Sequence, residues 1–100
     1  MNMIELTFKT GDNTYITLVD LNIRTGPGIH YPLQTREKMT EDGRNHSEGS
    51  ILKRGTRVTV KEFIVNPFES CAWLRIPSGY ICAVEDNKQY VKETEDYERK

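Results

Sequence analysis

The chain has 100 residues, a net charge of −1 and 29% charged residues. This length is typical of one domain with a modest core, because such a domain buries roughly two-thirds of the surface of its unfolded chain. The near-neutral charge gives no general attraction to nucleic acid or to an anionic membrane. No apolar run approaches the ~20 residues of a transmembrane helix, and residues 1–5 lack the basic and apolar regions of a secretory signal.

The first part of the chain predicts short β-strands, because apolar and polar residues alternate along it. Residues 4–8 (IELTF) alternate most clearly. They lie in an N-terminal extension, residues 1–13, which we expect either to add an edge strand or to pack on a partner. Residues 15–19 run into a strand at residues 21–23, which ends at the Gly-Pro-Gly turn of residues 26–28.

A long polar stretch follows before the strand pattern returns. Residues 34–50 have no strong periodicity, so we expect a long inserted loop that is functional or mobile. Further strand patterns occur at residues 51–52, 56–63, 71–76, 80–84 and 90–91. The sequence therefore predicts an all-β barrel of six or seven short strands over residues 14–92. The charged residues 93–100 are expected to form a frayed or weakly helical tail.

Cys71 and Cys82 are the two cysteines of the chain, and both lie in the hairpin that residues 71–84 predict. If Ile76 faces Tyr80, the two thiols are about three positions out of register, too far for the ~5.5 Å Cα separation that a disulfide prefers. We therefore expect two free thiols, made in a reducing cytoplasm. Neither has a second cysteine or a histidine at zinc-ligand spacing.

Four blocks of the sequence resemble the bacterial SH3 domain in order and spacing. The blocks are residues 21–28 (LNIRTGPG), 52–60 (LKRGTRVTV), 73–76 (WLRI) and 79–81 (GYI). The resemblance covers residues 14–92 and is closest to the C-terminal cell-wall-binding domains of endolysins from phages of Gram-positive bacteria. Those domains often carry a charged insertion before the second block, as residues 39–44 (MTEDGR) do here.

The resemblance implies an SH3-like barrel that binds the stem peptide or cross-bridge of peptidoglycan without catalysis or cofactor. In that family the module holds a separate hydrolase on the cell wall. No hydrolase sequence lies within these residues, so we expect either a fragment of a longer lysin or a binding subunit translated on its own. Such a module is made in the cytoplasm without a signal peptide and acts at the wall after release. One shallow groove binds weakly, so retention would come from homo-oligomers or from tethering to a lytic domain.

A groove for a short peptide or an amino sugar needs rigid, amphipathic walls, which tyrosine and tryptophan supply with few rotors to freeze. We therefore predict that Tyr31, Trp73 and Tyr80 line the groove. Trp73 shares a strand face with Arg75, opposite the more apolar face of the same strand, so we expect Trp73 to be partly exposed and Arg75 to contact ligand. The alternative interpretation is that Trp73 is the large core residue of a small barrel. Tyr15 and Tyr90 are expected in the core or at its rim.

Two polar residues of the first block are further candidates for ligand contact. Asn22 and Arg24 lie on the strand face opposite Leu21 and Ile23. The alternative for Asn22, and for Thr25 beside it, is a structural bond to the backbone around the turn. For Arg24 we weigh a contact with a ligand or a carboxylate against a structural role.

Other functions remain as alternatives to cell-wall binding. The main one is an intracellular phage or bacterial module for protein–protein interaction, through the same groove or through the loop at residues 34–50. A nucleic-acid-binding barrel would need a basic face with stacking aromatics, and the net charge argues against it. We expect no membrane partner and no metal. We also expect no catalysis, because the spacing does not assemble His30 or His46 with a nucleophile and an orienting group.

Overall fold

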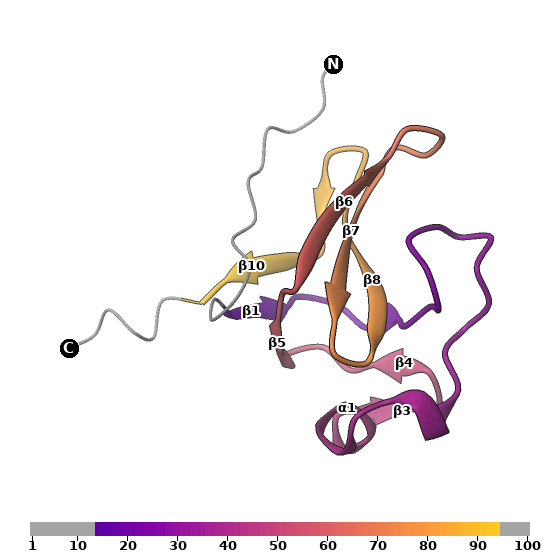
Figure 1. Cartoon of the computed structure of the whole chain (residues 1–100). Coiled ribbons are helices and arrows are strands. Elements are labelled where there is room, and N and C mark those ends of the chain that lie inside the picture. Colours follow the sequence, from indigo (N-terminus) through magenta and orange to yellow (C-terminus); the bar gives the residue numbers. More distant parts are fainter. Residues whose placement is uncertain (1–13, 95–100) are drawn as a thin grey trace.

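The computed structural model of the chain describes residues 14–94 (Figure 1). The extension at residues 1–13, with its expected strand at 4–8, and the tail residues 95–100 lie outside the described part. The described elements are β1 (Thr14–Thr17), β2 (Leu21–Asn22), the 3-10 helix η1 (Arg36–Lys38), α1 (Glu41–Asn45), β3 (Ser47–Glu48), β4 (Ile51–Leu52), β5 (Arg57–Thr59), β6 (Glu62–Asn66), β7 (Cys71–Ile76), β8 (Gly79–Glu85), β9 (Lys88–Gln89) and β10 (Val91–Glu93).

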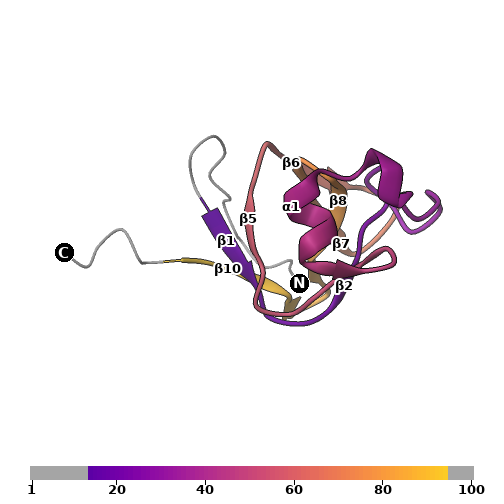
Figure 2. The ribbon, with the colours of Figure 1, turned by 90° about the horizontal axis from the view of Figure 1, so that it is seen from below.

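The strands of residues 14–94 form three antiparallel sheets. Their orders are β10-β1-β5, β2-β4-β3 and β6-β7-β8-β9. The prediction of an all-β chain is confirmed, although the three sheets do not join into one closed barrel in this part of the chain. Figure 1 shows the long β6–β7–β8 sheet standing above β4 and α1. Seen from below, α1 lies in front of β7 and β8, while β1 and β10 lie to one side (Figure 2).

The three sheets share one hydrophobic core. Its most deeply buried members are Ile23, Leu52, Val60, Leu74, Ile81 and Val91. The alternation predicted for the first block is confirmed, because Leu21 and Ile23 are buried while Asn22 between them is exposed. Tyr15 is also buried, and Tyr90 packs against the core, as expected. The core therefore fixes the β2 segment against the β7–β8 hairpin.

The pattern at residues 56–63 forms two strands instead of one. β5 pairs with β1, and β6 pairs with β7, so the chain changes sheet between Thr59 and Glu62. Val60 is fully buried at the change of direction. A buried valine at this corner continues the period-2 pattern through the bend, which explains why the sequence shows one strand there.

The expectation of an irregular loop at residues 34–50 is wrong, since η1, α1 and β3 all lie in it. Thr40 begins α1 as an N-cap, where its Oγ1 accepts a hydrogen bond from the Gly43 N–H at 2.9 Å. Glu41 and Asp42 occupy the first turn, where their negative charges interact favourably with the positive end of the helix dipole. With five residues the helix is too short to show an apolar stripe, so periodicity could not reveal it.

Two arginines connect the ends of this segment by reciprocal hydrogen bonds. Arg36 Nη1 donates to the Gly49 carbonyl at 2.8 Å, and Arg36 Nη2 donates to the Arg44 carbonyl at 3.2 Å. Arg44 Nη1 donates in turn to the carbonyls of Arg36 at 3.0 Å and Met39 at 2.8 Å. These basic side chains are therefore engaged within the segment and serve its structure.

Candidate binding site

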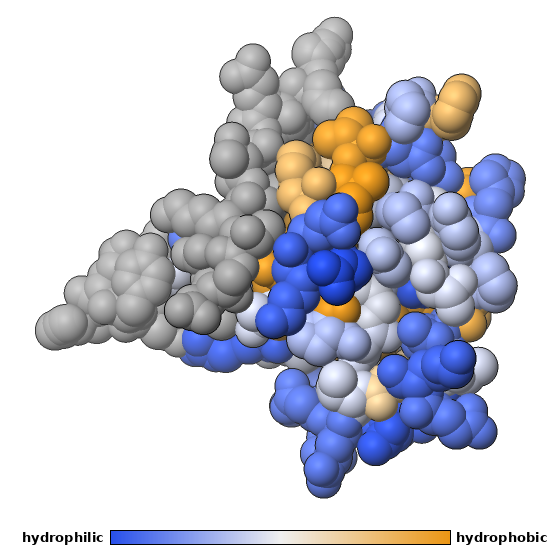
Figure 3. All heavy atoms as spheres, viewed as in Figure 1, coloured by the Kyte–Doolittle hydropathy of each residue, from blue (hydrophilic) through white to orange (hydrophobic). Residues whose placement is uncertain are grey.

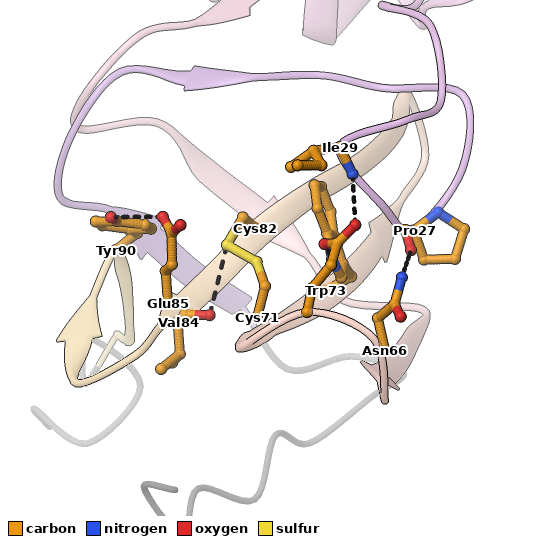
Figure 4. Close-up of a disulfide and its surroundings, with 10 residues drawn as sticks. Pro27, Ile29, Asn66, Cys71, Trp73, Cys82, Val84, Glu85 and Tyr90 are labelled. Atoms are coloured by element: carbon orange, nitrogen blue, oxygen red, sulfur yellow. Dashed lines mark hydrogen bonds between the residues drawn. A yellow bond between two sulfur atoms is a disulfide. The ribbon is translucent and has the colours of Figure 1, made fainter.

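A depression of about 430 Å³ lies between the β2 segment and the β7–β8 hairpin, and its surface is mostly apolar. The apolar and cysteine side chains of its lining are Val19, Leu21, Ile29, Cys71, Trp73 and Cys82. The polar ones are Asp20, Asn22, Arg24, Glu69, Ser70, Glu85 and Tyr90. Figure 4 shows part of this lining as a row, with Glu85 and Tyr90 at one end, the two cysteines in the middle, and Trp73 and Ile29 at the other end.

The expectation of two free thiols is wrong, because Cys71 and Cys82 form a disulfide (Figure 4). Their Cα atoms are 6.5 Å apart, within the range that a disulfide spans. Two features of the hairpin bring them together. Ile76 pairs with Gly79 instead of Tyr80, and the register shifts between Ala72 and Trp73.

This register shift is a β-bulge, in which one strand carries an extra residue. The pairing of Ile76 with Gly79 at the turn already places Cys82 opposite Trp73 instead of Leu74, and the bulge beyond it returns Cys71 to its predicted position opposite Glu85. Cys71 and Trp73 are two residues apart on one strand and therefore share a face. Cys82 consequently lies diagonally across from Cys71 on that same face, where the two sulfurs can bond.

Trp73 is only 2% exposed, so the expectation of a partly exposed ring is wrong and its burial fits the core interpretation. The indole Nε1–H donates to Glu69 Oε1 at 3.2 Å, and Ile29 lies over the ring (Figure 4). The loop that carries Ile29 is held by two bonds from the β6–β7 turn. Glu69 Oε2 accepts from the Ile29 N–H at 3.0 Å, and Asn66 Nδ2 donates to the Pro27 carbonyl at 3.0 Å.

This loop explains why the burial of Trp73 was mispredicted. Strand alternation assumes one covered face, whereas the loop at residues 26–29 covers the second face of β7. Trp73 therefore lies under the floor of the depression instead of standing in its wall. The indole of Trp73 nevertheless contributes to the lining of the depression.

Three of the six predicted contact residues lie outside the depression. Tyr31 is 45% exposed, and its ring lies so close to Gly26 that a Cβ there would collide with it. Tyr80 is half-buried and joins Arg24 through two backbone hydrogen bonds of 2.8 and 2.9 Å. Arg75 is exposed and pairs with Glu62, with 3.1 Å between Nε and Oε1. The structure therefore does not bring Tyr31, Trp73 and Tyr80 together as the walls of one groove.

Asn22, Arg24 and Trp73 do belong to the depression. Arg24 Nη1 donates to the carbonyl oxygen of Tyr31 at 2.9 Å, so the expected carboxylate partner within the described residues is replaced by a carbonyl. Asn22 is exposed, and its backbone pairs with Ile51 across β2 and β4. Both side chains come from the first block, whose alternation in the sequence placed them on the outer face correctly.

Carboxylates are the part of the depression that sequence reasoning missed. Asp20 accepts a hydrogen bond from the Arg54 N–H at 2.8 Å and lies 3.5 Å from Lys53 Nζ. The Arg54 N–H is the main reason why the pKa of Asp20 is below its usual value of 3.8, and Lys53 adds to the effect. Glu85 Oε1 accepts from the Tyr90 hydroxyl at 3.1 Å.

The pKa of the Tyr90 hydroxyl is also shifted. Its pKa is raised above 10.0, first by partial burial and then by the hydrogen bond to Glu85, which favours the protonated phenol. Asp20, Glu69 and Glu85 are far apart in the sequence and meet only through the tertiary fold. No local motif could therefore have assigned them to one site.

A second apolar surface lies along β6 and at the β6–β7 turn. Figure 3 shows apolar atoms on the front of the molecule over β6. Val65 of this strand is 53% exposed, and Phe68 at the turn is 93% exposed. Neither belongs to the lining of the depression, so both positions can serve as comparison sites in binding experiments.

Comparisons with protein-family models, curated proteins and solved structures find no match to this chain. The described residues also hold no group of three side chains that could ligate a metal ion. No helix within residues 14–94 has the length and apolar character to cross a membrane. The depression is the candidate site that we consider, because it combines an apolar surface with several polar side chains.

Proposed function

We propose that this chain is a non-catalytic binding module of SH3-like type that holds a peptide of bacterial peptidoglycan. The observation that carries the proposal is the mostly apolar depression between β2 and the β7–β8 hairpin. Two of the sequence blocks that resemble the bacterial SH3 domain contribute to its lining. Residues 21–28 supply Leu21, Asn22 and Arg24, and residues 73–76 supply Trp73 of the facing hairpin.

The size and chemistry of the depression suit a short extended segment. Its volume is within the ~300–1,000 Å³ of sites that enclose small ligands. Asn22 and Arg24 can offer hydrogen bonds at its edge, while Ile29 and the disulfide offer apolar contact. A stem peptide or cross-bridge of the wall would fit this combination of polar edge and apolar floor.

The lining favours binding over bond cleavage. Its cysteines are bonded to each other, so neither sulfur is available as a thiolate nucleophile. His46 lies outside the lining, on the α1 side of the molecule, with its Nδ1 3.3 Å from Asp42 Oδ1. These features support a site that holds its ligand without transforming it.

The disulfide also supports a place of action outside the reducing cytoplasm. Disulfides persist in oxidising environments and are rare in the cytosol. A chain made with two thiols would pass two electrons and two protons to an external oxidant, such as dioxygen, after release and would then meet the wall in its disulfide form. We propose that the module is made, released and oxidised in this order. Attachment to a lytic domain, or self-association, would then retain it on the wall.

Sedimentation with purified cell walls of several Gram-positive genera tests the proposal. Ile29→Ser should weaken binding about fivefold to tenfold, because the 58%-exposed Ile29 side chain loses about 1 kcal/mol or more of apolar contact with the ligand. Val65→Ser, at a similarly exposed position outside the depression, should bind as the unaltered chain does. Failure to sediment with any of the walls, or equal losses in both variants, would refute the proposal.

A further inference from the structure

Resting on the proposed function, we infer that the depression selects a protonated amino group carried on an alkyl chain. A diamino acid residue of the bound peptide would present such a group. The inference is drawn from the charges that the depression leaves uncompensated and from where its apolar surface lies. It adds a chemical class of ligand to the site described above.

The lining carries three carboxylates, Asp20, Glu69 and Glu85, against one guanidinium, Arg24. Of the three, Asp20 is compensated by Lys53 at 3.5 Å. Glu69 and Glu85 form no ion pair with a basic side chain within residues 14–94, and Lys88, which pairs with Glu85 in register across β8 and β9, is the nearest basic position in that hairpin. An uncompensated charge beside an apolar surface attracts an opposite charge more strongly than it would in open water.

Glu85 is the better anchor of the two, because part of its carboxylate is unoccupied. Its Oε1 accepts from the Tyr90 hydroxyl, whereas Oε2 has no hydrogen-bond partner among the described residues. Both oxygens of Glu69 are engaged, by the Trp73 indole and the Ile29 N–H. Glu69 therefore adds negative potential, and Glu85 offers the direct contact.

The surface beside Glu85 suits an alkyl stem. In Figure 4 the disulfide of Cys71 and Cys82 lies between Glu85 at one end and Ile29 at the other. A methylene chain along the disulfide would keep its apolar contact while its terminal ammonium reaches Glu85. The Arg24 guanidinium keeps its positive charge, but its Nη1 is turned to the carbonyl of Tyr31 at 2.9 Å, a residue outside the depression.

Three small probes test the inference directly: Nα-acetyl-lysine amide, its Nε-acetylated form, and Nα-acetyl-norleucine amide. They share a stem but differ in the terminal charge. The chain has one tryptophan, so the Trp73 Nε1–H gives a single signal in a ¹H–¹⁵N spectrum, and its bond to Glu69 places it at the depression. We expect the lysine probe to shift this signal at millimolar concentration, and the two uncharged probes to bind at least fivefold more weakly.

Two matched variants locate the contact. Glu85→Gln keeps an oxygen that accepts from Tyr90 but removes the charge, and we expect it to weaken the lysine probe at least fivefold. Glu37→Gln removes an exposed charge on η1, outside the depression, and should leave the affinity unchanged. Equal binding of charged and uncharged probes, or equal effects of the two variants, would overturn the inference.

Cell walls treated with acetic anhydride separate this inference from the proposed function. Loss of sedimentation after amine acetylation, with retention on mock-treated walls, supports both. Equal sedimentation with treated and untreated walls would sustain the binding module and overturn the amine selectivity. No sedimentation with either, alongside binding of the lysine probe, would sustain the amine site and overturn peptidoglycan as its ligand. Failure of both walls and probe would overturn both proposals.

Discussion

Removing the disulfide between Cys71 and Cys82 should destabilise the fold substantially. The bond closes a loop across a sequence separation of 11 residues. Chain-entropy arguments give about 3 kcal/mol for a loop of this size, because the crosslink restricts the unfolded chain. A loss of that size lowers the melting temperature of a small domain by roughly 12–24 °C.

Urea unfolding followed by the fluorescence of Trp73 measures this loss. The oxidised chain should be compared with the same chain after reduction and with the Cys71→Ala/Cys82→Ala variant. Reduction and the double variant should shift the unfolding midpoint in the same direction. The reduced chain controls for the change of volume that alanine introduces at the buried Cys71 position.

A thiol titration of the native, air-oxidised chain supplies the refuting result. We expect it to detect no free thiol before reduction and both cysteines afterwards. Two reactive thiols in the folded, oxidised sample would show that the register of the β7–β8 hairpin does not join the sulfurs. Unchanged stability after reduction would refute the entropic argument separately.

Two further predictions concern packing and pH. Gly43→Ala should lower stability by about 1 kcal/mol in thermal unfolding, because its Cβ would collide with the Ser78 hydroxyl and this outweighs the gain of about 1 kcal/mol in helix propensity. The loss should be largely removed in a Ser78→Ala background, and a higher melting temperature for Gly43→Ala alone would contradict the close approach. The lowered pKa of Asp20 means that its stabilising contribution is complete above pH 3.8 and declines as the pH falls through its folded-state pKa. Asp20→Asn should therefore flatten the stability profile below pH 3.8, and parallel acid profiles would show that this carboxylate is not involved.

The sequence predicted those parts of the fold that depend on local alternation. Leu21 and Ile23 are buried and Asn22 is exposed, as period-2 patterning requires. The β7–β8 hairpin also lies within a residue or so of its expected bounds, since strand patterns at residues 71–76 and 80–84 correspond to Cys71–Ile76 and Gly79–Glu85.

The site could be predicted only in part, because it depends on departures from regular geometry. The pairing of Ile76 with Gly79 at the turn decides whether the cysteines meet, and an alternating pattern carries no signal for this one-residue choice of register. The cover over Trp73 comes from a loop tied by Glu69, whose two partners are 4 and 40 residues away. Contacts of this kind arise from the tertiary fold, so the buried indole and the carboxylates around it required coordinates.

The reciprocal bonds of Arg36 and Arg44 have a consequence for how the molecule responds to its surroundings. Guanidinium groups stay charged across the whole range in which proteins fold, and main-chain carbonyls do not titrate at all. The hydrogen bonds that Arg36 and Arg44 make in the corner at residues 36–49 should therefore persist while acid or alkali changes the charge of Asp20 or Tyr90 in the depression, whose pKa values are shifted. These bonds between guanidinium groups and carbonyls would thus act as a brace that does not depend on pH, in contrast to the bonds of Asp20 and Tyr90.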